Sequence, residues 1–504
     1  MKSASGEESV TSQLQSLLAL TKTASLARWW RIADFLVFGL WLGLVSVILQ
    51  HHEPWADESQ SWLLARDLDL KTLWFHELRY NGTPGLWHTI LWIAQHWCHA
   101  PYAALGVIGM LCAAVGVAFI LWKAPFPRPL SYLLVFSYFL VYQYAVVARS
   151  YNLLPLLMFI AAYFYRDRSR PVRMTVVLML LANVSVHGTL LAAALSVCYL
   201  IEALKERQKL SDPVRSRYLF CVAAILLTFL FVFVIVKPMP DVAVFANHRI
   251  TGPRLIRLEA IVAYAFLDHP AISAVFLLLA SVWCLKRGKV LPFVLPVALM
   301  LLFFVAVYGR PHHHGTAFLA AIAGLWIAWP TQSEMREFSH GERLGTYGIT
   351  SLLVCLFCVN IWDAAVAMQN DYRYPYSGSA DAASFLKQVR ADKTTVFGYT
   401  YGMSAVQAYF DRNILANNPT TYYHEGLPLY ATVVDLSELQ AAAPEYVILC
   451  TNAGVMDFNN VDPPLRAIGY DRVRLSDGYV FYKRTAFDSA TYAIYRHRIS
   501  TAAR

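Results

Sequence analysis

The stretch that decides the fold is residues 219–236, LFCVAAILLTFLFVFVIV, which contains no charged side chain. A helix of about 20 apolar residues spans the hydrocarbon core of a bilayer. The stretch shows no alternation of polar and apolar residues and no polar helical face. It therefore predicts a helix that crosses a membrane, and not a strand of a transmembrane barrel.

Composition places the whole chain in the same class. Of its 504 residues, 57% are hydrophobic and only 15% are charged, and the mean hydropathy is +0.43. Soluble domains carry about 25% charged residues, so an ordinary soluble enzyme is excluded. The net charge of +9 comes mostly from loop arginine and lysine, which suits membrane topology and requires no nucleic acid as a partner. The 8 cysteines fall mostly in apolar runs and predict neither a metal site nor a disulfide framework.

Apolar runs predict an all-α polytopic membrane domain over residues 33–366 with eleven crossings. Basic connectors mark the cytoplasmic side, and the number of crossings between two such connectors must be even. This parity predicts that segment 1–32 is cytoplasmic, that the first helix is a retained anchor, and that the C-terminal region lies outside. The expected spans are 33–50, 102–122, 129–147, 151–165, 174–187, 188–204, 218–236, 259–285, 290–308, 315–330 and 347–366.

One apolar stretch, residues 84–98, does not fit this parity. It is short, contains His88 and His96, and carries three tryptophans, a residue enriched where helices lie at the membrane surface. We therefore expect it to lie at the interface, within a long first outer loop over residues 51–101. The alternative is that it crosses the bilayer, which would give twelve crossings.

Residues 367–504 have the composition of a soluble domain. Interleaved strand and helix signals predict a small α/β domain, which is extracytoplasmic by the parity of the crossings. It contains no phosphate loop, dinucleotide fingerprint, metalloprotease motif or nucleophile elbow, so we interpret it as a lid or docking platform. The expected strands are 395–399, 446–450 and 479–483, and the expected helices are 381–390, 403–410 and 437–443.

The first outer loop opens with HHEPWADES at residues 51–59. Adjacent carboxylates just beyond a membrane helix are costly to hold near hydrocarbon unless they are used or paired. Asp57 is therefore a candidate general base for an acceptor hydroxyl, and Glu58 is expected to orient the acceptor or to bind a divalent cation. The alternative is that both residues only form the acidic first turn of a helix over 59–66, where the helix dipole favours them.

Basic residues at the outer ends of helices give a second signal. Membrane proteins carry fewer such residues on that side, so their presence suggests an anionic ligand, and the arginine fork matches a phosphate. The alternatives are snorkelling to lipid headgroups and structural ion pairs such as Arg257 with Glu259. The residues are Arg149, Lys237, Arg249, Arg254, Arg257 and Arg310.

Histidines and tyrosines accompany these cations. Three consecutive histidines on a helix cannot all face one metal ion, so we interpret His312 as a phosphate or sugar contact. His187 lies between two short predicted helices and is either a ligand contact or a satisfied polar cap. Tyr151 is expected to stack on a sugar or to bind a phosphate, unless it is an ordinary interfacial tyrosine.

Four elements follow one another in a distinctive order: the acidic pair Asp57-Glu58, GTPGLW at 82–87, ARSYNL at 148–153, and a helix pair hinged at His187. This order resembles the GT-C membrane glycosyltransferases, in particular the protein O-mannosyltransferases and the bacterial lipid A aminoarabinose transferases. The resemblance covers residues 30–330. It departs from the family pattern where the usual His-Pro-Pro is replaced by GTPG at 82–85.

The resemblance implies a GT-C-like membrane domain that transfers a sugar from a polyprenyl-phosphate donor to a lipid, glycan or protein acceptor. It implies the bacterial inner membrane as location, with the active site facing the periplasm. The predicted enzyme is an inverting hexosyl- or pentosyltransferase with Asp57 as general base, and the only cofactor considered is a divalent cation at Asp57 and Glu58. The residues expected to bind the donor are Arg149, Tyr151, His187, Arg249, Arg310 and His312.

Two other classes of function fit the same residues. A lipid-linked sugar flippase or other transporter would use the carboxylate and the arginines to bind a headgroup without chemistry. Transporters often contain internal repeats and helices broken near the midplane, and the sequence shows no repeat. A structural assembly subunit would instead have the C-terminal domain as its working part.

Overall fold

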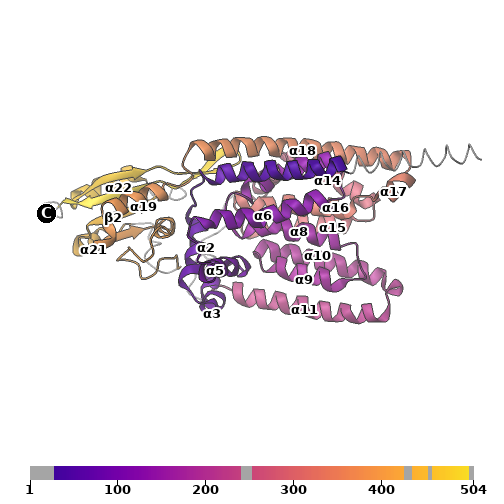
Figure 1. Cartoon of the computed structure of the whole chain (residues 1–504), viewed down its shortest axis with the longest axis horizontal. Helices are drawn as coiled ribbons and strands as arrows, with labels where there is room; N and C mark the ends of the chain where they lie inside the picture. The colour runs from indigo at the N-terminus through magenta and orange to yellow at the C-terminus, as the bar shows by residue number, and fades with distance from the viewer. Residues whose placement is uncertain (1–27, 240–252, 425–433, 452–456, 499–504) are drawn as a thin grey trace, which may run out of the picture.

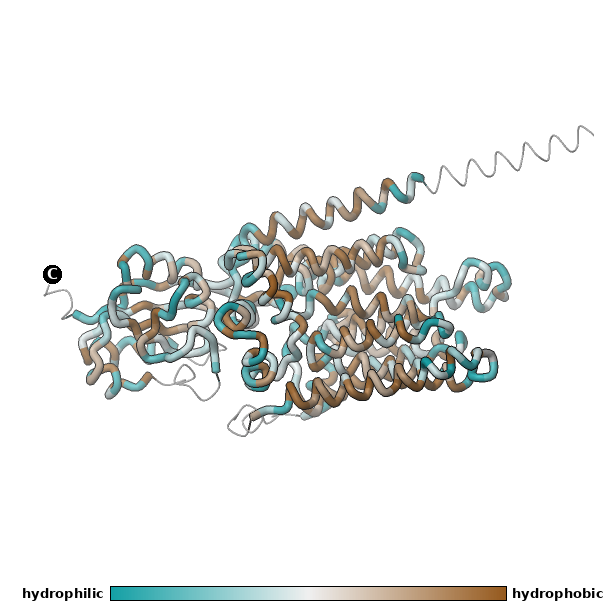
Figure 2. Tube along the Cα trace, turned by 60° about the horizontal axis from the view of Figure 1, so that its bottom comes forward, coloured by the Kyte–Doolittle hydropathy of each residue, from teal (hydrophilic) through white to brown (hydrophobic). Residues whose placement is uncertain are grey.

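The computed structural model describes residues 28–239, 253–424, 434–451 and 457–498. Its long helices lie side by side in a bundle, and the C-terminal domain sits at one end of that bundle (Figure 1). Apolar residues follow the bundle helices, whereas polar residues dominate the C-terminal domain and the connections at the opposite end (Figure 2). This distribution is that of an integral membrane protein with a polar region at each end of its apolar bundle.

Within the described residues, five helices are each long and apolar enough to cross a membrane, and a bent pair adds a sixth if it counts as one span. The eleven expected spans are therefore not all continuous long helices. The long helices are Arg28–Leu49, α6 (Ala104–Lys123), α10 (Val186–Lys205), α11 (Asp212–Val236) and α18 (His340–Arg373). The bent pair is α13 (Arg254–Ala265) and α14 (Pro270–Lys286). The shorter helices are α7 (Arg128–Val135), α8 (Leu154–Phe164), α9 (Pro171–Ala182), α15 (Val290–Ala306), α16 (Pro311–Ala328) and α17 (Gln332–Glu337).

The span expected over residues 259–285 is sharply bent. α13 and α14 meet at an angle of 73°. Pro270 disfavours the helical conformation at the preceding residue, and His269 accordingly has extended φ and ψ angles. Asp268 has a positive φ of 55° and completes the break.

The expectation of a continuous helix over residues 129–147 is wrong. α7 is followed by a short π-helix, Phe139–Gln143, and then by irregular backbone that leads to Arg149. Every residue from 137 to 148 is buried. Irregular backbone at membrane depth is tolerated only where protein surrounds it, and this break delivers Arg149 to the end of the bundle.

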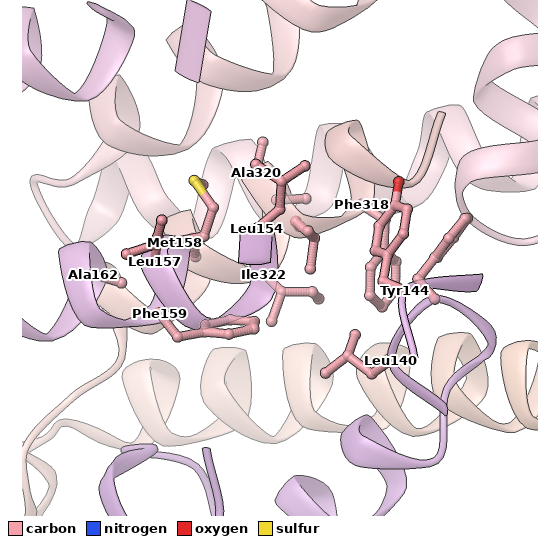
Figure 3. Close-up of a cluster of buried hydrophobic side chains, with 14 of the residues drawn as sticks. Leu140, Tyr144, Leu154, Leu157, Met158, Phe159, Ala162, Phe318, Ala320 and Ile322 are labelled. Carbon is pink, nitrogen blue, oxygen red and sulfur yellow. The ribbon is translucent and has the colours of Figure 1, made fainter. Parts of the chain in front are cut away.

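The core of the bundle forms around α16, in which residues 312–328 are all buried. Small residues let its neighbours approach closely. A Cβ atom at Gly324 would lie 2.7 Å from the Cα atom of Phe293 in α15. Figure 3 shows Ile322 of α16 beside apolar side chains of α8, with which it shares the core. This packing fixes the end of α16, where the consecutive histidines lie.

Short helices between the bundle and the C-terminal domain fill the first outer loop (Figure 1). The helix expected at 84–98 is confirmed as α5, although its depth in a membrane stays a prediction. The acidic pair lies in the first turn of α2. The elements are α2 (Ala56–Asp67), α3 (Leu70–Thr72), the π-helix Leu73–Glu77, α4 (Leu78–Asn81) and α5 (Leu86–His96).

The C-terminal α/β domain follows α18, which continues to Arg373, beyond the expected boundary at 366. Its main sheet has the order β1-β2-β6-β3, in which β1 and β2 are parallel and the other pairs antiparallel. The strands expected near 395, 446 and 479 are confirmed, whereas β3, β5, β6 and α22 were not predicted. The elements are α19 (Ser379–Gln388), β1 (Val396–Tyr399), α20 (Met403–Gln407), α21 (Leu436–Ala442), β2 (Tyr446–Cys450), α22 (Phe458–Ala467), β3 (Tyr470–Ser476), β4 (Tyr479–Tyr482), β5 (Thr485–Ser489) and β6 (Tyr492–His497).

The β4–β5 hairpin anchors this domain to the bundle through its turn. Lys483 Nζ lies 2.6 Å from Asp268 Oδ1 and 2.9 Å from Asp363 Oδ2. Arg484 Nε lies 2.9 Å from Asp363 Oδ1, and Arg484 also pairs with Asp268. Lys483 and Asp363 are buried, so these four residues form an ion cluster at the junction.

Candidate active site

Asp57 lies where the first turn of α2 meets both the bundle and the C-terminal domain. Its Oδ2 atom is 2.7 Å from Nη1 of Arg149. Its Oδ1 atom accepts a hydrogen bond of 2.5 Å from the hydroxyl of Tyr401, which precedes α20. The side chain of Asp57 is 19% exposed and that of Arg149 is 22% exposed. The candidate base is thus paired on both oxygens and remains close to solvent.

Arg149 is held by groups from three segments. Its backbone N–H donates to Asn152 Oδ1 at 2.6 Å, and its guanidinium lies over the ring of Tyr151, 5.5 Å from the centroid. Its Nη1 atom also lies 2.9 Å from Nε2 of His312. Burial lowers the pKa of Arg149, but the charge of Asp57 together with the neighbouring tyrosine hydroxyls raises the pKa above its ordinary value.

His312 connects Arg149 to the C-terminal domain. A guanidinium only donates hydrogen bonds, so Nε2 of His312 accepts, and Nδ1 carries the proton of the neutral ring. Nδ1 lies 3.1 Å from the hydroxyl of Tyr482 at the end of β4. A series of contacts therefore connects the first outer loop, the bundle and the C-terminal hairpin. It runs from Asp57 to Arg149, then to His312 and to Tyr482.

Glu58 takes a different position from Asp57. It is fully buried, and its Oε1 atom accepts a 2.6 Å hydrogen bond from the backbone N–H of Ala148. Its Oε2 atom lies 3.2 Å from His52 Nε2 and accepts from the backbone N–H of Trp55. These contacts hold the backbone beside Arg149.

His52 lies between two carboxylates. Its Nδ1 atom is 2.8 Å from Asp371 Oδ2 near the end of α18, and its Nε2 atom faces Glu58. Burial alone would lower the pKa of His52, but the charges of Asp371 and Glu58 and their hydrogen bonds raise it from 6.5 to about 10. The hydroxyl of Tyr142 donates to the same Asp371 oxygen at 3.0 Å. This cluster connects the first outer loop to α18.

A cavity of about 1230 Å³ opens next to Arg149. Three cations, Arg149, Lys237 and Arg254, belong to its lining, together with Gly82 and Thr83 of the first outer loop. The rest of the wall is largely apolar and comes from α10, α11 and α15. Its apolar residues include Leu190, Phe229, Val232, Phe233, Phe303 and Ala306. The cavity thus combines a cationic part with an apolar part.

Two other predicted ligand contacts, Tyr151 and His187, also line the cavity. The Tyr151 hydroxyl lies 3.2 Å from Nδ1 of His187, and the His187 ring is 4.6 Å from the ring of His313. Arg310 lies beside Tyr308, a cavity residue, and its backbone N–H donates to His313 Nδ1 at 3.1 Å. The helix pair predicted to hinge at His187 breaks at residues 183–185 instead, and His187 lies in the first turn of α10.

One predicted donor contact, Arg249, lies outside the described residues. Among the residues that the structure does describe, no group of three or more His, Cys, Asp or Glu side chains is arranged to hold a metal ion. Asp57 and Glu58 also bind different partners, Arg149 and the backbone N–H of Ala148. The divalent cation at this pair stays a prediction.

Four residues of the site were not found from the sequence. Tyr401 and Tyr482 come from the C-terminal domain, and His52 and Asp371 pair across the chain. His52 belongs to the HHEPWADES segment, whose acidic pair marked it as a candidate site. Asp371 follows the last apolar run, 347–366. The two tyrosines lie in a domain rich in aromatic residues, so nothing in the sequence distinguishes them.

No protein-family model matches the sequence, and no curated protein matches it. The structure is similar to that of ArnT from Cupriavidus metallidurans bound to undecaprenyl phosphate, with 10% identity and a TM-score of 0.54. The match covers 91% of this chain and 97% of that one. It is also similar to the apo state of the same protein, with 12% identity, a TM-score of 0.50, and coverage of 92% and 97%. The chain therefore has the fold of ArnT across both its membrane bundle and its C-terminal domain.

Proposed function

We propose that this protein is an integral membrane glycosyltransferase that moves a sugar from a polyprenyl-phosphate carrier to an acceptor. The observation that carries the proposal is the cavity lined by Arg149, the ion-pair partner of Asp57. Its cations, Arg149, Lys237 and Arg254, suit a phosphate, and its apolar wall suits an isoprenoid chain. The same fold in a protein that binds undecaprenyl phosphate supports this choice of carrier.

The proposed reaction is a single displacement with inversion. Asp57 takes the proton of the acceptor hydroxyl while that oxygen attacks the anomeric carbon, and the carrier phosphate leaves with the bonding electrons. Arg149 leaves its ion pair with Asp57 and binds the phosphate, whose negative charge grows as the bond breaks. This exchange frees one oxygen of the base at the moment when donor occupies the cavity.

The remaining residues have supporting roles in this proposal. Tyr151 and His187 line the cavity and contact the donor head, whereas His312 orients Arg149. Arg310 contacts Tyr308, which lines the cavity, and adds positive charge to that end of the cavity. Glu58 holds the backbone N–H of Ala148 and is a positioning residue rather than a base.

The proposed setting is the bacterial inner membrane, with the cavity mouth and the C-terminal domain on the periplasmic side. Eleven crossings with the N-terminus inside satisfy the distribution of basic loops. The acceptor is a lipid, a glycan or a protein, and the transferred group is a hexose or a pentose.

The proposal is tested with purified full-length protein in liposomes that contain undecaprenyl-phosphate arabinose or undecaprenyl-phosphate mannose, labelled in the sugar. Bacterial envelope lipids and glycans serve as acceptors. Release of label from the carrier into acceptor, absent in the Asp57→Asn variant, is the expected result. Label that crosses the bilayer while it stays on the carrier would instead identify a flippase.

A further inference from the structure

We propose that Tyr401 caps Asp57 in the free protein, holding the place of the attacking hydroxyl and preventing hydrolysis of the donor before an acceptor arrives. This inference rests on the proposed role of Asp57 as general base. It makes Tyr401 a positioning residue of the reaction and gives the C-terminal domain a direct part in the active site.

The first observation is the geometry of the hydroxyl. The Tyr401 O–H donates to Asp57 Oδ1 at 2.5 Å, a length typical of a charge-assisted bond. An acceptor hydroxyl awaiting deprotonation must make the same contact, with its oxygen in the same place. Because Arg149 pairs with Oδ2, both carboxylate oxygens of Asp57 have a protein partner in this state.

The second observation is the set of contacts between the C-terminal domain and α2. The side-chain amide of Gln60 exchanges two hydrogen bonds with the backbone of Tyr423, of 2.8 and 2.7 Å. The Ser404 hydroxyl donates to the carbonyl oxygen of Ala56 at 3.2 Å. The ring of Tyr423 also packs against that of Tyr401, with centroids 4.9 Å apart. Contacts on either side of Asp57 therefore place the Tyr401 hydroxyl.

The third observation is the part of the structure that supplies each partner of Asp57. Arg149 is part of the cavity lining, whereas Tyr401 comes from the C-terminal domain. In an inverting displacement the nucleophile approaches the face of the sugar opposite the leaving group. With the carrier phosphate at Arg149, the attacking hydroxyl comes from the side of Tyr401. The acceptor then displaces the tyrosine hydroxyl and delivers its own O–H to the same carboxylate oxygen.

The chemical step is balanced for either nucleophile. With an acceptor, its hydroxyl oxygen bonds to the anomeric carbon, its proton passes to Asp57, and the carbon–oxygen bond to the carrier phosphate breaks. With water the same changes release free sugar and polyprenyl phosphate. Tyr401 takes part in neither change, and its hydroxyl only decides whether a water molecule occupies the position beside Oδ1.

The experiment measures release of free sugar from labelled undecaprenyl-phosphate arabinose or mannose in liposomes without acceptor. Tyr401→Phe keeps the ring and removes only the hydroxyl. We expect it to raise the rate of donor hydrolysis about tenfold, which corresponds to loss of one hydrogen bond to a charged group. The KM for donor should stay unchanged, because the variant leaves the lining of the cavity intact. The double variant Asp57→Asn/Tyr401→Phe should hydrolyse nothing.

Tyr399→Phe is the matched control. Its hydroxyl donates to Glu438 at 3.0 Å within the C-terminal domain, so the variant loses a comparable bond without touching Asp57. It should hydrolyse donor at the wild-type rate. If Tyr401→Phe transfers sugar normally and hydrolyses donor no faster than wild type, the capping role is wrong while the proposed function stands. Absence of turnover in every variant would overturn both.

Discussion

Nη1 of Arg149 lies 2.7 Å from Oδ2 of Asp57, so the candidate phosphate-binding group and the candidate base neutralise each other in the free protein. An unpaired guanidinium or carboxylate near the end of a membrane bundle would cost several kcal/mol. The pair removes that cost in the free protein. In the reaction that we propose, a phosphate replaces the carboxylate, and binding of the donor is thereby coupled to release of the base.

Asp57→Asn should lower sugar transfer by at least about 100-fold, the usual contribution of a general base. The amide keeps the shape of the side chain but does not accept a proton at neutral pH. Because Arg149 loses a charged partner, the melting temperature should fall slightly. Asp69→Asn is the control, since Asn caps α3 as well as Asp does. Transfer at the wild-type rate in Asp57→Asn would refute the assignment of the base.

Arg149→Ala should remove the rise in melting temperature that undecaprenyl phosphate gives to the wild-type protein. Arg149→Lys keeps the charge but loses the two-pronged contact, so its rise should be intermediate. The variants are compared by thermal unfolding in detergent with and without the lipid. Equal lipid-induced rises in wild type and Arg149→Ala would mean that Arg149 serves only the ion pair with Asp57.

Ala306→Trp should block the apolar part of the cavity, because Ala306 belongs to its lining on α15. We expect the variant to lose stabilisation by undecaprenyl phosphate. Leu302→Trp on the same helix is the control, since Leu302 is 65% exposed and does not line this cavity. Stabilisation by the lipid that persists in Ala306→Trp would place the isoprenoid chain elsewhere.

Lys483→Met should weaken the attachment of the C-terminal domain to the bundle. The variant leaves Asp363 and Asp268 with one cation, Arg484, instead of two. Breaking a buried ion pair costs about 3–5 kcal/mol. The loss is measured as faster proteolysis between the bundle and the domain and as a lower melting temperature. Lys393→Met, at an exposed site of the same domain, should change neither. A combined Lys483→Met/Asp363→Asn variant should be less destabilised than the sum of the single variants.

Stability should fall as the pH rises above neutrality, because of His52. Its pKa in the folded protein is about 10, above the ordinary value of 6.5, so its protonated form is favoured by folding. The resulting stabilisation is complete below pH 6.5 and is lost as the pH rises from 6.5 to 10. Melting temperatures over this range should decline for wild type. His52→Gln should be less stable at neutral pH and should show a flatter dependence; an equally steep decline would assign the effect to another group.

Several elements were predictable because local patterns determine them. Residues 219–236 lie in α11, and the tryptophan-rich stretch 84–98 contains α5, since hydropathy and periodicity depend on neighbours in the chain. The breaks inside 129–147 and 259–285 were not predicted. The first stretch has no charged residue, and its tyrosines bond to other helices, Tyr142 to Asp371 and Tyr144 to the carbonyl of His312. The second contains Asp268-His269-Pro270, a local break signal that mean hydropathy does not register.

For the candidate site too, the sequence determined one part and the tertiary structure another. The sequence by itself determined that Asp57 and Glu58 stand beyond a membrane helix and that Arg149 needs a partner, because charge near hydrocarbon must be satisfied. Only the tertiary structure decided that Asp57 takes Arg149 and Tyr401 while Glu58 takes His52 and the backbone of Ala148. These partners come from separate segments of the chain. Their meeting depends on how helices and the C-terminal domain pack, and the residue spacing of the sequence contains no record of that packing.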